Sequence, residues 1–210
     1  MITVLICVHS QDDLHDRLFA EALDSLLSQT YKDFKTVIVF DECWDKTLSV
    51  ANKLNNYIQI IRRYKTGLAD AKNEGIKYID SEWIAFLDAD DKWMPDKLEK
   101  QIKYCDRTDI ISTHYWWRKL SETGEEITES CFSTSDYITH EQITARLPQE
   151  NVLCHGSILI RRSVFDTLKY RNFKGQEDWQ LWKDCYKSGY RFYQLPERLY
   201  IYTTNTSVAR

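Results

Sequence analysis

Residues 83–91, with the sequence WIAFLDADD, join a short apolar run to a cluster of carboxylates. An apolar run of this length, with β-branched and aromatic residues, predicts a buried strand. Carboxylates crowded at the end of a buried strand are unstable unless a positive charge lies among them. Oxygen ligands of this kind suit Mg²⁺ or Mn²⁺, and such a cation commonly bridges to substrate phosphates. The stretch therefore predicts a sheet strand with chemistry on a phosphorylated compound at its end.

Strands and helices are predicted to alternate along the part of the chain that leads to this stretch. Runs rich in β-branched residues predict strands at residues 2–8, 35–40, 57–62 and 83–87. Apolar positions at helical spacing predict helices at residues 13–28, 46–54 and 68–79, with Asp45 as the N-cap of the second. This alternation is typical of βαβ units, so we expect an α/β fold with a mostly parallel central sheet flanked by helices.

The second half of the chain is less regular. Its predicted helices are residues 96–105, 140–147 and 176–187, and its predicted strands are residues 109–117, 127–134 and 191–202. An apolar segment, residues 152–160, is broken by the polar sequence His155-Gly156-Ser157. We find no internal repeat and no low-complexity segment. The composition changes near residue 105, which indicates a border within one domain of residues 1–210 rather than a second separable domain.

Composition argues against several classes of protein. The 210 residues are 43% hydrophobic and 29% charged, as in a soluble globular domain. A net charge of −4 gives no long-range attraction to nucleic acid or to an anionic membrane. The six cysteines have no zinc or redox spacing, and no apolar run reaches the length of a signal peptide or a membrane span. We therefore expect a reduced, cytoplasmic protein.

Two common nucleotide-binding signatures are absent. The first predicted strand is not followed by G-x-G-x-x-G, which argues against a dinucleotide cofactor, and no G-x-x-x-x-G-K-[ST] indicates a P-loop NTPase. In open α/β sheets, ligands bind beyond the carboxyl ends of the strands. The candidate groups at these ends are residues 7–10, 41–42 and 88–91. A nucleotide would therefore be held by side chains at the strand ends.

Several segments follow one another in a recognisable order. SLLSQTY (25–31) fits Ser-x-x-x-Gln-Thr-Tyr, GLADAKNEG (67–75) is close to Gly-x-x-x-Ala-Arg-Asn-x-Gly, DADD (88–91) fits D-x-D and is followed by Pro95, and QEDWQLW (176–182) fits a helix start with Glu-Asp-Trp. Taken together, they resemble family 2 of the glycosyltransferases, inverting enzymes of the GT-A fold that use nucleotide sugars. CVHS (7–10) and FDEC (40–43) depart from the family's Pro-x-Tyr-Asn and Asp-Asp-Gly-Ser. The resemblance covers nearly the whole chain and implies a Rossmann-like GT-A fold with a smaller mixed portion for the acceptor.

The resemblance implies that residues 1–105 bind the nucleotide sugar. Asp90 should bind Mn²⁺ or Mg²⁺, and Asp88 should bind the metal or the ribose hydroxyls. The metal would neutralise the diphosphate as it leaves. Asp41 should hydrogen-bond the nucleotide base.

Other residues of this half are expected around the same ligand. Cys7 and His9 end the first strand and would border the nucleotide. Lys72 stands where the family has Arg, and its ammonium would balance phosphate charge without a bidentate fork. Trp93 resembles the family's aromatic residue after the metal motif and would border the sugar pocket.

The resemblance also implies that residues 106–210 hold the acceptor and the catalytic base. Inversion needs a base on the face opposite the leaving diphosphate, and a carboxylate near the acceptor hydroxyl can take its proton. Asp178, the second acid of the Glu-Asp pair, is predicted to be this base, with Glu177 as the alternative. Without the resemblance, both acids would be assigned to the first turn of a helix, where they favour the dipole.

Some positions have two interpretations. Asp91 either orients its neighbours or caps the next helix. His155 is better explained as a hydrogen-bonded core histidine than as a metal ligand, and Gly156 either lets a substrate approach or turns the chain. Because adjacent strand residues point to opposite faces, at most one of Trp116 and Trp117 faces a cleft as a platform for sugar rings.

We therefore expect an enzyme that transfers a sugar from a UDP-linked or other nucleoside diphosphate sugar to a hydroxyl. The acceptor would be a glycan, a lipid-linked intermediate or another hydroxyl compound, and nucleic acid is not expected as a partner. Two alternatives stay open: a non-catalytic nucleotide-sugar-binding protein of the same fold, and a sugar-nucleotide pyrophosphorylase. The expected location is the cytoplasm, including the membrane periphery.

Overall fold

A computed structural model of the chain describes residues 1–55, 57–62, 67–127, 131–132, 138–173 and 175–205. The strands are β1 (Ile2–Val8), β2 (Phe34–Asp41), β3 (Ile58–Arg62), β4 (Trp83–Phe86), β5 (Lys92–Trp93), β6 (Ile110–Leu120), β7 (Cys131–Phe132), β8 (Leu159–Arg161) and β9 (Phe192–Asn205). The α-helices are α1 (Asp13–Leu27), α2 (Asp45–Val50), α3 (Leu68–Ile76), α4 (Lys97–Gln101), α5 (His140–Arg146) and α6 (Glu177–Lys187). Short 3₁₀ turns are η1 (Ala51–Lys53), η2 (Ile102–Tyr104), η3 (His155–Ser157) and η4 (Arg162–Asp166).

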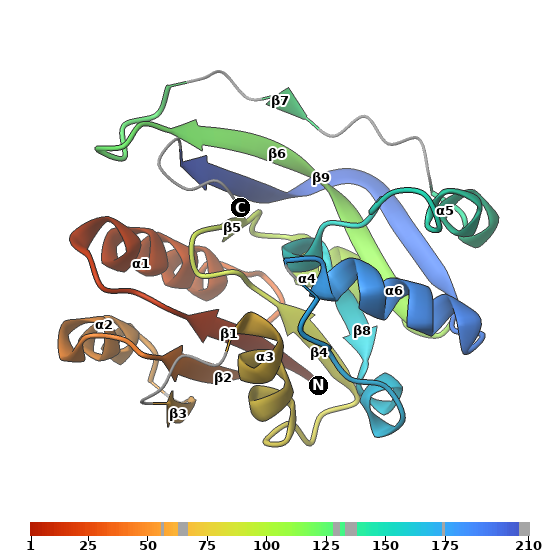
Figure 1. Cartoon of the computed structure of the whole chain (residues 1–210), viewed down its shortest axis with the longest axis horizontal. Coiled ribbons are helices and arrows are strands. Elements are labelled where there is room, and N and C mark those ends of the chain that lie inside the picture. The colour runs from red at the N-terminus through yellow and green to blue at the C-terminus, as the bar shows by residue number, and fades with distance from the viewer. Residues whose placement is uncertain (56, 63–66, 128–130, 133–137, 174, 206–210) are drawn as a thin grey trace.

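The strands form one mixed sheet in the order β3-β2-β1-β4-β8-β6-β9-β5, with β7 paired to β6. The βαβ half is parallel, as predicted, because β1 pairs in parallel with both β2 and β4, and β2 pairs in parallel with β3. β8 runs antiparallel to β4 and β6, whereas β6 and β9 are parallel to each other. In Figure 1, β6 and β9 lie side by side across the upper part of the molecule, with α1 and α2 at the left and α5 and α6 at the right.

Helices cover both faces of the sheet, and the alternation of β1 shows how. Val4 and Ile6 belong to a buried cluster with α1 and the end of α2, whereas Leu5 belongs to a second cluster with α3 and α6. This period-two alternation is what a strand buried on both faces requires. Gly75 of α3 is needed for the second layer, because a Cβ there would overlap the Leu5 side chain.

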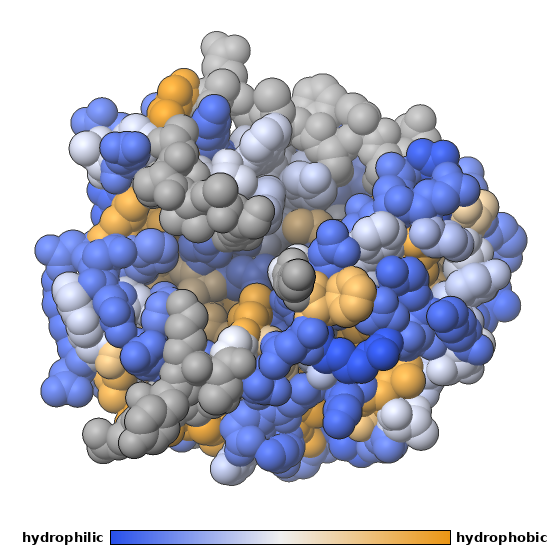
Figure 2. Space-filling model, viewed as in Figure 1, coloured by the Kyte–Doolittle hydropathy of each residue, from blue (hydrophilic) through white to orange (hydrophobic). Residues whose placement is uncertain are grey.

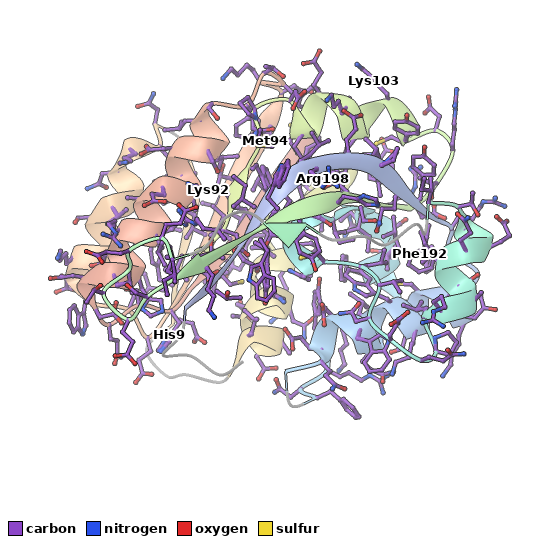
Figure 3. All side chains as sticks on the ribbon, turned by 90° about the horizontal axis from the view of Figure 1, so that it is seen from above. His9, Lys92, Met94, Lys103, Phe192 and Arg198 are labelled. Carbon is purple, nitrogen blue, oxygen red and sulfur yellow. The ribbon has the colours of Figure 1, made fainter. Side chains whose placement is uncertain are left out.

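The SLLSQTY segment connects α1 to the chain that follows the acidic cluster. Gln29 is fully buried, and its amide donates to the Met94 carbonyl at 2.8 Å and accepts from the Leu98 amide at 3.1 Å. Ser25 Oγ accepts from the Trp93 amide at 3.1 Å. Figure 3 shows Lys92 and Met94 between α1 and the β6–β9 ribbon. These contacts fix where the acidic cluster stands relative to the sheet.

The element boundaries differ from the predictions in a few places. Trp44, not Asp45, is the N-cap residue of α2, and Asp45 is the first residue of the helix. β5 was not predicted, since two residues carry no periodicity. Of the strand expected at 127–134, only β7 is seen, and residues 128–130 and 133–134 lie outside the described residues. Among the described helices, none is both long and apolar enough to cross a membrane.

Candidate functional site

A large cleft of about 1350 Å³ lies beyond the carboxyl ends of β1 and β4 and at the starts of α3 and α6. The space-filling view shows this face hollowed near its middle (Figure 2). The predicted site residues that line the cleft are Cys7, His9, Lys72, Asp88, Asp90, Glu177 and Asp178. Asp41 and Trp93 do not line it. The topology therefore brings together residues from both halves of the sequence at the sheet edge where ligands bind in open α/β folds.

The acidic cluster divides between the cleft and the core. Asp88 and Asp90 are half-buried and line the cleft. Asp91 is completely buried and accepts hydrogen bonds from the Tyr200 hydroxyl and the Thr203 amide. Burial raises the pKa of Asp91 well above its ordinary value, and the charges of its two acidic neighbours act in the same direction. Asp91 thus ties the cluster to β9 and caps no helix.

Asp88 and Asp90, the members of the acidic cluster that face the cleft, could bind a divalent cation whose other ligands come from the substrate. Among the described residues, no group of three or more His, Cys, Asp and Glu side chains could hold a metal alone. Mg²⁺ is usually held by one or two carboxylates together with substrate phosphates and water, and Asp88 and Asp90 supply that number. Asp88 and Asp90 could therefore hold such a cation only together with a phosphorylated ligand.

His155 stands behind Asp88. Its Nδ1 lies 3.5 Å from Asp88 Oδ1, and its Nε2 is 3.0 Å from the Tyr170 hydroxyl. The imidazole is 8% exposed and packs against the Phe86 ring at 4.6 Å between centroids. It has the hydrogen-bonded, buried environment that the sequence favoured. His155 lines the cleft directly beside Asp88.

The two acids at the start of α6 have different environments. Glu177 is buried, and its Oε1 lies 3.1 Å from the Nζ of Lys72, itself 3% exposed. Burial opposes ionisation of Glu177, but the Lys72 charge and hydrogen bond outweigh it and lower its pKa. Asp178 lines the cleft, where Asn151 donates to Oδ2 at 3.0 Å and the Trp179 amide to Oδ1 at 2.6 Å. Of these two acids, Asp178 is the one whose carboxylate is partly exposed to the cleft while hydrogen bonds fix its orientation.

The end of β1 forms another wall of the cleft. His9 Nδ1 lies 2.7 Å from the Asp41 carbonyl oxygen, and the buried Asp16 carboxylate accepts from Ser10 Oγ at 2.9 Å and from Thr47 Oγ1 at 2.6 Å. Asp16 was not singled out in the sequence, although it is a buried acid on a helix. Asp16 therefore joins the loop that follows β1 to helix α2, and its hydrogen bond from Ser10 fixes the last residue of the CVHS segment.

Two predicted site residues, Asp41 and Trp93, are buried and do not line the cleft. The Asp41 carboxylate is 5% exposed and lies behind the cleft wall. Trp93 is 3% exposed and donates its indole N–H to the Gly156 carbonyl at 2.9 Å. Trp93 thus contacts the 3₁₀ turn η3, which contains His155. Of the two adjacent tryptophans, Trp117 lines the cleft and Trp116 lies over the Arg198 guanidinium at 4.9 Å.

Comparison with known proteins identifies the family. The family model described as Glycosyl transferase family 2 matches residues 3–169. The chain belongs to glycosyltransferase family 2. It is 31% identical over 189 residues to the O-antigen biosynthesis glycosyltransferase WbnJ of Escherichia coli, covering 87% of this chain and 70% of WbnJ. It is 29% identical to the E. coli UDP-Glc:alpha-D-GlcNAc-diphosphoundecaprenol beta-1,3-glucosyltransferase WfaP, covering 90% of this chain and 71% of WfaP.

Solved structures agree on the fold. S. aureus TarS 1–349 superimposes with a TM-score of 0.73 at 18% identity, over 96% of this chain and 60% of that one. The same TarS fragment has been solved with UDP-GlcNAc. The mannosyltransferase PcManGT of Pyrobaculum calidifontis, solved with GDP-Man and Mn²⁺, superimposes with a TM-score of 0.70 at 17% identity, over 95% of this chain and 56% of that one. This chain thus spans little more than half of these solved chains. The expected GT-A fold and the assignment as a glycosyltransferase are confirmed.

Proposed function

We propose that this glycosyltransferase moves a sugar from a nucleoside diphosphate sugar, with uridine as the nucleoside, to an acceptor hydroxyl with inversion. One observation carries the proposal: a single cleft contains the carboxylates of Asp88 and Asp90 and, from α6, the oriented carboxylate of Asp178. The TarS structures with UDP and UDP-GlcNAc and the PcManGT structure with Mn²⁺ support a nucleotide-sugar donor and a divalent metal. We assign the donor to residues 1–105 and the acceptor to residues 106–210.

The donor diphosphate is proposed to lie between the acidic cluster and α3. Asp88 and Asp90 would hold Mn²⁺ or Mg²⁺, which supplies charge neutralisation for the leaving diphosphate. Because Glu177 already balances the Lys72 ammonium, Lys72 contributes to orienting α3 and α6 as much as to phosphate binding. The nucleotide base is assigned to the β1 wall beside Cys7 and His9. Asp41 supports that wall through its carbonyl oxygen.

Asp178 is proposed as the general base. The acceptor oxygen forms a bond to the anomeric carbon as the bond from that carbon to the diphosphate breaks, and the hydroxyl proton passes to the Asp178 carboxylate. Asn151 and the Trp179 amide hold the two carboxylate oxygens, which reduces the orientations that the base samples. Glu177 is a poor alternative because it is buried and paired with Lys72.

The test separates the base from the metal ligand. Asp178→Asn should lower donor hydrolysis and sugar transfer about 10²- to 10⁴-fold, with Mn²⁺-dependent UDP binding still measurable by calorimetry. Asp90→Ala should lose the Mn²⁺ dependence of UDP binding. Asp24→Asn, which changes an exposed acid outside the cleft, is the matched control. Unchanged turnover in Asp178→Asn would remove it as the base, and loss of UDP binding in the same variant would make it structural.

A lipid-linked acceptor has support from one relative. The name of WfaP specifies an undecaprenyl diphosphate sugar as the acceptor. We extend this to the present chain as a proposal, together with the cytoplasmic, membrane-peripheral location expected from the sequence. Sedimentation of the protein with vesicles that contain a sugar-diphospholipid, compared with vesicles that lack it, tests the location. Equal recovery in the soluble fraction for both vesicle types would contradict it.

A further inference from the structure

A row of aromatic rings lies on one face of the β6–β9 ribbon. In the register of these strands Tyr115 lies opposite Tyr200, and Trp117 lies opposite Tyr202. Residues two apart on a strand share a face, and residues directly opposite each other across strands do so too. The rings pack edge to face, with centroids 6.5 Å apart for Tyr115 and Tyr200 and 5.8 Å apart for Tyr115 and Tyr202. Three of the rings are thus in contact, and the strand register places the fourth, Trp117, opposite Tyr202 at the end of the row.

The row runs from the acidic cluster to the mouth of the cleft. At its inner end Tyr200 is fully buried, and its hydroxyl contacts Asp91 and lies 3.4 Å from Asp88 Oδ2. Tyr115 and Tyr202 follow, half-buried, and Trp117 at the outer end is 43% exposed. One step of two residues along a strand is about 7 Å, on the scale of one six-membered sugar ring. A ligand on Trp117 and Tyr202 would thus lie about one sugar ring away from the acidic cluster beside Tyr200.

The Trp117 side chain is exposed, yet a hydrogen bond holds its ring in place. Its indole N–H donates to Thr204 Oγ1 at 2.7 Å, so the polar edge is satisfied and the ring is fixed. Tyr115, Trp117 and Tyr202 all line the cleft. The adjacent Trp116 lies on the other face of the ribbon, over Arg198. Figure 3 shows His9 on one side of this ribbon and Lys103 on the other. A large aromatic surface left open in a cleft and fixed at its edge is typical of a binding surface.

The charged side chains around the aromatic row indicate which class of ligand it binds. In the described part of the chain, the Lys and Arg side chains that line the cleft are Lys72 and Arg146, and they are outnumbered by the acids Asp88, Asp90, Glu150, Glu177 and Asp178. Single-stranded nucleic acid needs a cationic groove beside its stacking rings, which this cleft does not offer in the residues described. Arg146 and Asn151 also line the cleft and can hydrogen-bond hydroxyls. Uncharged C–H faces beside hydroxyl groups are the surface of a saccharide.

We propose that Trp117 and Tyr202 stack on a pyranose ring of the acceptor, so that the acceptor of this enzyme is a saccharide. The inference rests on the proposed function, because it places the acceptor opposite the donor in the same cleft. It assigns the part of the cleft formed by β6 and β9 to acceptor recognition. The donor base is assigned to the β1 wall beside Cys7 and His9, so Trp117 and Tyr202 are left for the acceptor.

The test measures saccharide binding without turnover. Saturation-transfer NMR is recorded with methyl β-glycosides of glucose, galactose and N-acetylglucosamine, in the presence of UDP and Mn²⁺. The protein should transfer saturation to the ring protons of at least one glycoside. Trp117→Ala should weaken its binding about tenfold, the scale of one aromatic contact, and Trp117→Phe should restore most of it. Trp44→Ala is the matched control, since Trp44 is 47% exposed and lies outside the cleft lining.

Calorimetry of UDP with Mn²⁺ on the same variants separates the two proposals. Unchanged UDP binding in Trp117→Ala, with glycoside binding weakened about tenfold, is the expected result. If UDP binds and no glycoside gives a signal that depends on Trp117, the saccharide acceptor is wrong and the donor site stands. If Trp117→Ala weakens UDP binding as much as glycoside binding, the rings serve the donor, and the inference is overturned. If the wild-type protein binds no UDP, the proposed function itself fails.

Discussion

Removal of the Lys72 charge should destabilise the protein far more than removal of an exposed lysine. In Lys72→Met the Glu177 carboxylate stays buried without its counter-charge, and the ammonium that lies 5.1 Å from the Tyr170 ring centre is lost. Breaking a buried pair from one side costs about 3–5 kcal/mol. A domain of this kind has a free energy of unfolding of about 5–15 kcal/mol, so the variant should fold with much less reserve.

Urea unfolding at pH 7 gives the measurement. With a slope of about 2 kcal/mol per molar urea, the midpoint should fall by roughly 1.5–2.5 M. The double variant Lys72→Met/Glu177→Gln should be more stable than Lys72→Met, because no buried charge is left alone. Lys35→Met is the control, since its partner Asp80 is 3.3 Å away and both side chains are at least half exposed; it should cost less than about 1 kcal/mol.

The pH dependence follows from the same pair. Although burial opposes it, Lys72 lowers the folded pKa of Glu177 below 4.5, so the pair stabilises the wild-type protein above that pH and loses its contribution as the pH falls through the folded pKa. In Lys72→Met, Glu177 takes up a proton on moderate acidification. The stability difference between the two proteins should therefore shrink from pH 7 to pH 4. Equal costs for Lys72→Met and Lys35→Met, with an additive double variant, would refute the buried pair.

Three further outcomes are expected. Gly156→Ala should cost about 1–3 kcal/mol in thermal unfolding, because its Cβ would overlap the Tyr200 ring; a cost below about 0.5 kcal/mol, the range of an ordinary surface substitution, would contradict this. Tyr200→Phe should cost about 1–3 kcal/mol by removing a donor from buried Asp91, whereas the exposed Tyr78→Phe should be neutral. Burial raises the pKa of the Cys43 thiol to about 11, so its alkylation, followed by mass spectrometry, should be slow at pH 8 and rise about tenfold per pH unit; a rate independent of pH would count against it.

Local patterns were sufficient to predict most of the fold. The parallel half was predictable because each strand carries a continuous apolar run and each helix its own apolar stripe. β5 was not, since its two residues are defined only by their pairing with Tyr200 and Ile201. The order of the acidic and glycine-rich segments along the chain was enough to predict most of the residues that line the cleft, although Asp41 and Trp93 are not among them.

The predictions for the site were limited by contacts across long stretches of chain. Lys72 and Glu177 are 105 residues apart, and no local pattern shows that each neutralises the other. Asp91 could not be distinguished from Asp88 and Asp90 by sequence, because its burial depends on a strand that comes much later. The aromatic row had a local signal in Tyr115 and Trp117, two apart on one strand, but the facing Tyr202 becomes a neighbour only through the register of β9.

The hydrogen bonds of Asp91 also set an order of events during synthesis. Its partners lie on β9, and Tyr200 is 109 residues further along the chain. Contacts of such large sequence separation form late, after local helices and the first strand pairs. A nascent chain released only as far as β8 can assemble the β1–β4 layer while Asp91 still lacks its hydrogen-bond donors. Asp91 should therefore gain these hydrogen bonds only once the ribosome has delivered β9, so the acidic cluster reaches its final arrangement late in synthesis.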